Sequence, residues 1–131
     1  MGKYQDTDSD IFSLFDVDTW TIKTVPSNFV TKGLEKYIRV NIIKGSKGIY
    51  FNSLSGILMI EIFISAGEGP KELSLIADKL DSLLQGKTLS TKVGAITQLG
   101  ISAMADNGID KDNAALFKAT YTIPFKYFGV N

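Results

Sequence analysis

The chain has 131 residues, with 14 basic and 14 acidic side chains, 44% hydrophobic residues and a formal net charge of zero. It contains no cysteine and no histidine, which excludes thiol nucleophiles, Ser-His and Cys-His relays and zinc sites of the usual kind. An enzyme of this composition would have to work with carboxylates, lysines and tyrosines. The length suffices for one soluble domain that buries its own core, so we expect a single domain over residues 1–131, with residues 1–10 flexible.

The charged residues are spread along the whole chain. Arg39 is the sole arginine and the lysines occur without a run, which argues against a protein whose main task is to grip phosphates. The N-terminus is acidic where a signal peptide would be apolar. The longest apolar stretch, 56–66, contains Glu61 and is shorter than the ~20 residues that cross a bilayer. We therefore expect a protein that is neither exported by a signal peptide nor embedded in a membrane.

The N-terminal quarter of the chain shows few regular patterns. Residues 1–10 are polar and acidic, and Asp10–Phe15 offers capping residues for a short helix of one or two turns. Between Trp20 and Gly33 no period is sustained, and Pro26 with the serine and asparagine after it indicates a loop or an extended crossing.

Two paired strands are predicted next, over 37–44 and 56–65. In the first, apolar residues alternate with polar ones, which is the period of a half-buried strand. The second is apolar on both faces except at Glu61. Antiparallel pairing that sets Arg39 opposite Glu61 keeps the apolar residues in register, whereas a slip by one residue loses that match. The predicted partners are Ile38 with Ile62, Val40 with Ile60, and Ile42 with Leu58.

An amphipathic helix is predicted from Pro70 to Gly86. Pro70 suits a first helical position, Glu72 adds negative charge to the first turn, and Gly86 suits the C-terminal end. Between these ends, apolar residues recur at spacings of three and four, the pattern of a helix with one buried face. The apolar stripe consists of Leu73, Ile76, Ala77, Leu80, Leu83 and Leu84.

Two further strands are predicted, a weaker one over 93–101 and a strong one over 117–127, with a turn at 106–110 between them. Pro124 removes one backbone donor, so the last strand should lie at an edge there or direct that position away from its neighbour. The residues predicted to share one face are Val93, Ala95, Leu99 and Ile101 in the first strand, and Phe117, Ala119, Tyr121, Ile123, Phe125 and Tyr127 in the second.

These elements predict an α+β fold: an antiparallel sheet with one long amphipathic helix, in the order short helix, two strands, helix, two strands. The first two strands are apolar on both faces, and a single long helix covers only one of them. The second face falls either to the N-terminal segment, with Phe12, Leu14, Phe15 and Trp20, or to a neighbouring subunit. The sequence leaves both solutions open.

Three features have the residue types of functional sites. The acidic segment 106–113 has the composition of a calcium loop, but its ligand spacing fails and no glutamate closes it. Residues 67–70 open a helix with two glycines, yet no lysine follows at P-loop spacing and Pro70 removes a donor. Glu61 is either an acid with a raised pKa or, as we favour, the cross-strand partner of Arg39.

Four aromatic residues near the C-terminus, Tyr121, Phe125, Tyr127 and Phe128, have two interpretations. They could stack on the bases of single-stranded nucleic acid, but basic residues are too sparse to follow a phosphate chain, so a core or interface role is favoured. No catalytic constellation remains. We therefore expect no enzymatic activity, no cofactor and no metal.

A linear pattern of six segments runs through the chain from about residue 20 to 128. In their order and spacing these segments resemble the tail-terminator (minor tail) proteins of long-tailed bacteriophages. The family usually has a longer N-terminal helix than residues 6–15 allow. The segments are Trp20, Pro26-Ser27-Asn28-Phe29, Tyr37–Ile43, Gly56–Phe63, Gly67-Glu68-Gly69 at the start of a helix, and Tyr121–Phe125.

The resemblance implies a structural virion protein, a small α+β subunit that forms a hexameric ring on the last ring of the tail tube. Such a ring ends tube polymerisation and joins the tube to head-completion (neck) proteins at the head-proximal end of the tail, after assembly in the host cytoplasm. DNA would pass through its lumen without specific binding, with which zero net charge is compatible. The alternatives are another head-tail connector or tail-tube subunit, and a small ligand-binding α+β module.

Two connections are candidate contacts with neighbouring subunits or tube rings, the segment 44–55 and the loop 105–113. The first carries aromatic side chains between glycines and serines, which suits burial by a partner, although these side chains could equally fold back on the protein's own core. The second face of the 56–65 strand adds two apolar residues. The predicted interface residues are Ile49, Tyr50, Phe51, Met59, Phe63, Asp106 and Asp110.

Overall fold

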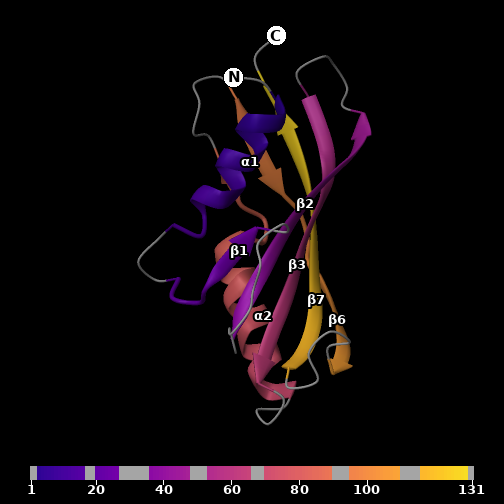
Figure 1. The fold of residues 1–131 in the computed structure, drawn as a ribbon. Coiled ribbons are helices and arrows are strands. Elements are labelled where there is room, and N and C mark those ends of the chain that lie inside the picture. Colours follow the sequence, from indigo (N-terminus) through magenta and orange to yellow (C-terminus); the bar gives the residue numbers. More distant parts are fainter. Residues whose placement is uncertain are drawn as a thin grey trace.

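The computed structural model describes residues 3–16, 20–26, 36–47, 53–65, 70–89, 95–109 and 116–129. Within these ranges the chain forms two helices and seven strands (Figure 1). The helices are α1 (Lys3–Ser13) and α2 (Pro70–Leu84). The strands are β1 (Thr24–Pro26), β2 (Tyr37–Lys47), β3 (Ser53–Ser65), β4 (Thr88–Leu89), β5 (Ile96–Leu99), β6 (Ala103–Ile109) and β7 (Leu116–Phe128).

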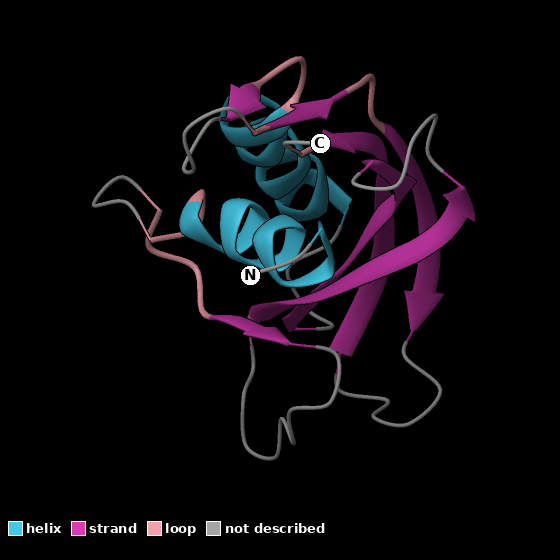
Figure 2. Ribbon diagram, turned by 90° about the horizontal axis from the view of Figure 1, so that it is seen from above, coloured by secondary structure: helices cyan, strands magenta, loops and turns pink. Residues whose placement is uncertain are grey.

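The fold is mostly β, which corrects the predicted α+β class. One sheet curls into a half-barrel, and two short helices lie inside the curl (Figure 2). The predicted order, with one long helix between two pairs of strands, is also wrong, because β1, β4 and β6 join the sheet as well. β1 and β4 span three and two residues, too few to show a two-residue period, and β6 falls where asparagine and glycine favour a turn.

The sheet has the strand order β1-β2-β3-β7-β5-β4, and β6 also pairs with β7. Neighbouring strands are antiparallel except β1 and β2, which are parallel. The predicted register between β2 and β3 is confirmed, so apolar matching across this pair is sufficient to fix it. The observed partners are Ile38 with Ile62, Arg39 with Glu61, Val40 with Ile60, and Ile42 with Leu58.

β7 is the strand on which the two halves of the sheet meet. One edge of β7 pairs with β3 along its whole length, while the other pairs with β6 at its start and with β5 at its end. Pro124 lies at the break between β6 and β5, where its carbonyl accepts a hydrogen bond from the Gly100 N–H at 2.9 Å. Because the amide and carbonyl positions of a strand residue face the same side, the donor that Pro124 lacks faces this break and not β3. β7 is therefore not an edge strand. Of the two arrangements predicted for Pro124, the observed one directs its missing donor away from the neighbouring strand β3.

The segment predicted as the turn 106–110 is mostly strand. Asp106 to Ile109 belong to β6, and the register with β7 shifts between Asp106 and Gly108. A bulge at this place lets the chain continue its pairing past two turn-forming residues. Ile101, predicted to face inward, is 81% exposed, because the chain leaves the β5 ladder at Gly100. Val93, from the same predicted face, lies outside the described residues.

Both helices pack on the inner face of the sheet. α2 buries most of its predicted stripe and is followed by Gly86 with a φ of 70°, a left-handed conformation that suits glycine. α1 begins at Lys3, within the stretch expected to be flexible, and the expectation that a helix starts only near Asp10 is wrong. The N-terminal apolar residues join the same core, so the proposal that they cover the second face is also wrong. They are Ile11, Phe12, Leu14, Phe15 and Trp20.

The core on this face is built mainly from β3, β7 and α2. The inward face predicted for the 117–127 strand is confirmed, since its alternate residues are buried or pack against the core. Neither described helix is long and apolar enough to cross a membrane. The largest fully buried side chains include Tyr121, Phe125, Tyr127, Ile60, Ile62, Ile64, Leu73 and Leu80.

Gly56 is required by the close approach of β2. A Cβ atom at this position would lie 2.0 Å from the carbonyl oxygen of Ile43 and 2.9 Å from Cζ of Phe125. We expect Gly56→Ala to lower the free energy of unfolding by about 1–3 kcal/mol, because the backbone must shift to admit the methyl group. Gly45→Ala is the matched control, since its Cβ would find its nearest neighbour at 3.9 Å. Urea denaturation of both variants tests this, and equal losses would contradict it.

Candidate functional site

The outer face of the sheet, opposite both helices, is divided into a sealed part and an open part. In the sealed part, the rings of Tyr37 and Phe63 stack at a centroid distance of 4.5 Å and an interplanar angle of 15°. Both side chains are at most 3% exposed and cluster with Val25 and Leu116. This second small core closes the outer face at the end of the sheet where β2 begins and β3 ends.

Charged residues border the stacked rings. The guanidinium of Arg39 lies 5.6 Å from the centre of the Phe63 ring, and the Lys118 ammonium lies 5.8 Å from the same ring. Lys118 also forms an ion pair with Glu61 at 2.5 Å. Arg39 and Glu61 do lie directly opposite each other, as predicted. The ion pair seen for Glu61 nevertheless reaches across to β7, which sequence reasoning missed because the third strand's register was not known.

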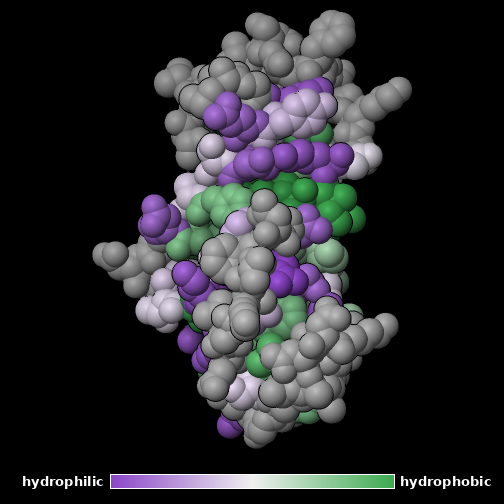
Figure 3. Space-filling model, in the orientation of Figure 1, coloured by the Kyte–Doolittle hydropathy of each residue, from purple (hydrophilic) through white to green (hydrophobic). Residues whose placement is uncertain are grey.

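The open part of the outer face carries a row of apolar residues across three neighbouring strands. Ile43 on β2 lies opposite Ile57 on β3, and Ile57 lies opposite Pro124 on β7. Ile43 is 42% exposed and Ile57 46%, and Pro124 is exposed as well. We call these three residues the apolar row. Figure 3 shows hydrophobic surface gathered in a band across the middle of the molecule, between hydrophilic zones.

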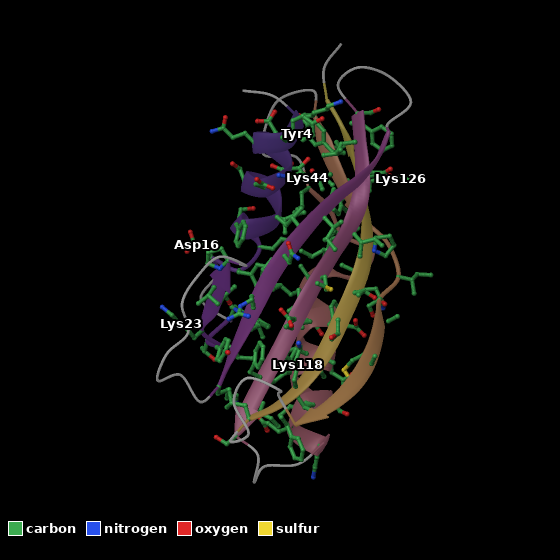
Figure 4. All side chains as sticks on the ribbon, turned by 45° about the vertical axis from the view of Figure 1, so that its right-hand side comes forward. Tyr4, Asp16, Lys23, Lys44, Lys118 and Lys126 are labelled. Atoms are coloured by element: carbon green, nitrogen blue, oxygen red, sulfur yellow. The ribbon has the colours of Figure 1, made fainter. Side chains whose placement is uncertain are left out.

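A shallow groove of about 550 Å³ adjoins the apolar row. It lies where β5 ends beside β7, and Gly100 forms part of its wall against Pro124. Among the described residues that line it, Lys126 is the one with a charge, and Figure 4 shows this lysine on the side of β7 away from α1. The groove therefore offers apolar surface with a cation at its border. Its other lining residues include Ser55, Gly56, Ile57, Thr88, Gln98, Leu99 and Phe125.

The predicted interface residues fall in three different places. Met59 is half-buried on the outer face, two residues from Ile57, whereas Phe63 is 2% exposed within the sealed part. Asp106 is paired through its backbone with β7. The remaining four residues, Ile49, Tyr50, Phe51 and Asp110, lie outside the described residues. Ile43 and Ile57 could be recognised from the sequence as a second apolar face, but Pro124 could not be placed beside them without the β3–β7 register.

α1 is fixed to the sheet by buried polar groups. The hydroxyl of Tyr127 donates to Asp6 at 2.8 Å, and the hydroxyl of Thr97 donates to Asp10 at 2.7 Å. Asp6 and Asp10 are 5% and 2% exposed. Burial raises the pKa of Asp10, the Thr97 hydroxyl lowers it, and the nearby carboxylate of Asp6 raises it again, with a net upward shift. The four-residue spacing of the two aspartates is a helical signal that a search for apolar periods overlooks.

A lysine from β2 fastens the outer side of the same helix. The Lys44 ammonium lies 2.8 Å and 2.9 Å from the two carboxylate oxygens of Asp8. It also lies 6.0 Å from the centre of the Tyr4 ring, and Figure 4 shows Tyr4 and Lys44 at the same end of the molecule. Lys44 thus joins the start of the predicted contact segment to α1.

A second polar cluster joins α2 to the sheet. The Tyr121 hydroxyl donates to Asp81 at 2.7 Å, and the Ser102 hydroxyl donates to the same carboxylate oxygen at 2.5 Å. The Ser102 N–H donates to Gln85 at 3.0 Å. Burial, and then the hydrogen bond to Asp81, raise the pKa of Tyr121 well above its ordinary value. These groups satisfy one another and hold the start of β6 against α2. In the described ranges, no three acidic side chains gather closely enough to hold a metal ion.

Comparisons with known proteins support the fold alone. No protein-family model matches the sequence, and no curated protein matches it. One solved structure is similar over 95% of this chain and 92% of its own chain, with a TM-score of 0.66 and 12% sequence identity. Identity this low establishes a shared architecture and carries no activity or partner from one protein to the other.

The raised pKa of Asp10 has a direct consequence for stability. The folded protein holds the Asp10 proton more tightly than the unfolded chain does. The stability gained from this proton is therefore complete below the pKa of the unfolded chain, 3.8. This stability is lost as the pH rises through the raised pKa of Asp10 in the folded protein. We expect Asp10→Asn to remove this part of the pH dependence and to narrow the stability difference between mildly acidic and neutral solution. Urea denaturation across that pH range tests it, with Asp78→Asn on the exposed face of α2 as control. An unchanged pH profile in the Asp10 variant would contradict the assignment.

Proposed function

We propose that this protein is a structural virion component that caps the tail tube of a long-tailed bacteriophage as a ring. The ring ends tube polymerisation and forms the joint to the head-completion proteins. The observation that carries the proposal is the apolar row on a sheet face that neither helix covers. The sequence resemblance supplies the identity of the assembly, and the apolar row supplies a surface that assembly would bury.

The apolar row has the properties of a subunit contact. Ile43 and Ile57 are each about half exposed, and burying the remainder against a neighbour is worth about 1 kcal/mol for each side chain. In a closed ring every subunit makes such a contact twice, so modest contacts hold the assembly together. Backbone pairing fixes the row across three strands, so little conformational entropy is lost on binding.

The sealed part of the outer face contributes to folding of the subunit, and the open part contributes to assembly. The stacked Tyr37 and Phe63 rings are buried within a single copy, so this part of the outer face needs no neighbour to cover it. The apolar row then stabilises the ring when a neighbouring subunit covers it. Zero net charge over the chain suits a ring whose lumen passes DNA without holding it, because phosphate binding requires clustered cations.

The groove favours a second candidate function, a small ligand-binding module. Its volume of about 550 Å³ lies in the range of small-molecule sites, and its border carries Lys126, which suits a ligand with a negative group. The groove is open to solvent, whereas small-molecule sites usually bury most of the ligand surface. We therefore place this function second.

A charge placed in the apolar row should prevent ring formation. We expect Ile57→Lys to abolish closed rings and tube capping, because the neighbour would bury an unpaired ammonium, while thermal unfolding stays within a few degrees of the parent protein. Leu75→Lys is the control, since Leu75 is 48% exposed on α2, far from the row. Native mass spectrometry and electron microscopy with polymerising tail tubes measure the two outcomes.

The same measurements separate the alternatives. A protein that polymerises without limit by itself would be a tube subunit, and one that stays monomeric with tubes present would not be a terminator. Phage particles lacking this chain, with tails of normal length joined to filled heads, would contradict the proposed function outright.

A further inference from the structure

β6 presents a strand edge with no described partner. Among the described residues β6 pairs only with β7, so its other edge is not used in the ladders of the sheet. Thr122 lies two residues from Pro124, whose carbonyl faces this side of β7, so the backbone groups of Ala103 and Ala105 face β7. The N–H and C=O groups of Met104 and Asp106 therefore face outward. Unpaired groups in such a row are a template for another strand.

The side chains on this edge do not protect it. Ala103, Met104 and Ala105 are all exposed, with Met104 at 41%, and Ile101 before them is 81% exposed. Natural edge strands are usually shielded by lysine, by proline or by very short length. From Ile101 to Ala105 the chain has no charged residue. The composition of Ile101–Ala105 is therefore typical of a strand whose edge pairs with another strand.

The other edges among the described strands are shielded in the usual ways. β2 has no described partner on one edge from Asn41 to Lys47, and this stretch carries Lys44 and Lys47. β1 has three residues and ends at Pro26, which cannot donate a backbone hydrogen bond. β4 has only two residues. Addition of β1 or β4 of one copy to β6 of another would therefore form few bonds. β6 itself is the least shielded strand available to complement β6.

We propose that β6 pairs antiparallel with β6 of a second copy of this chain, about a two-fold axis at Ala105. In this register Met104 lies opposite Asp106 of the second copy, and Asp106 lies opposite its Met104. The outward groups of both residues then form four main-chain hydrogen bonds between the copies. The two small Ala105 side chains meet at the closest point of the ladder.

Charge favours this register over the one centred on Asp106. A two-fold axis at Asp106 would set two carboxylates directly opposite each other, which destabilises a cross-strand pair. An axis at Ala105 sets each Asp106 opposite Met104 instead, so the two aspartates are not directly opposed. The Ser102 contacts with Asp81 and Gln85 hold the start of β6 in place before pairing, which reduces the entropy lost on association.

This contact differs from the ring contact and does not depend on it. A two-fold contact closes on itself and gives a dimer, whereas a ring requires contacts between different surfaces of neighbouring subunits. The β6 pair is also small compared with a stable interface, so we expect a reversible monomer–dimer equilibrium. A dimer of this kind would keep the edge of free subunits from pairing with other proteins.

A charge swap at the two-fold axis tests the register. Ala105→Lys and Ala105→Glu each set like charges against each other, so each variant alone should dimerise at least tenfold more weakly than the parent protein. Mixed in equal amounts, they should recover dimers, because the opposite charges then meet. Sedimentation equilibrium of the full chain measures all three samples, and circular dichroism checks that each variant is folded.

A second variant tests the backbone bonds. The Met104 N–H faces away from β7, so Met104→Pro removes an outward donor without removing a bond inside the sheet, and we expect it to be monomeric. Leu75→Lys serves as the control and should dimerise as the parent does. A parent protein that is monomeric at every concentration would overturn the proposal. So would dimers that persist unchanged in both Ala105 variants, and this result would leave the proposed ring untouched.

Discussion

The antiparallel ladder between β3 and β7 is the constraint on which the rest of the structure depends. It runs from Ser53 opposite Phe128 to Ser65 opposite Leu116 without interruption. Every other strand joins one of these two directly or through a single intermediate. Because side chains alternate across each strand, this one register decides which apolar residues meet the helices and which meet the outside. A sheet so long and so twisted curls, and the curl makes room for the helices on one side only.

The inner face is completed by two helices that attach in different ways. α2 contributes a leucine-rich stripe, whereas α1 is held by Asp6 and Asp10 through hydroxyl groups of the sheet. Buried carboxyl groups stabilise a fold only while their partners remain, so the position of α1 depends on the hydrogen bonds from Thr97 and Tyr127. With both helices on the inner side, the outer face must close itself or stay open.

Local sequence patterns were enough to predict an element where an apolar period ran over many residues. The β2–β3 register, the extent of α2 and the inward face of β7 followed from apolar spacing and from Arg39 facing Glu61. The class of the fold did not follow, because β1 and β4 are too short to carry a period and α1 buries polar residues. The apolar row could be predicted only in part. Its two isoleucines were recognisable from the sequence, but Pro124 lies beside them only because β3 pairs with β7, which is distant in the sequence. Non-local pairing is the information that periodicity lacks.

The apolar row and the free edge of β6 both lie next to β7. Pro124 interrupts the ladder on one side of β7, and this break separates β5 from β6. The same proline adds its ring to the row on the outer face. β7 thus contributes one residue to the apolar row and pairs with the strand whose other edge is free. Apolar surfaces and free strand edges are the two kinds of surface that proteins use to assemble.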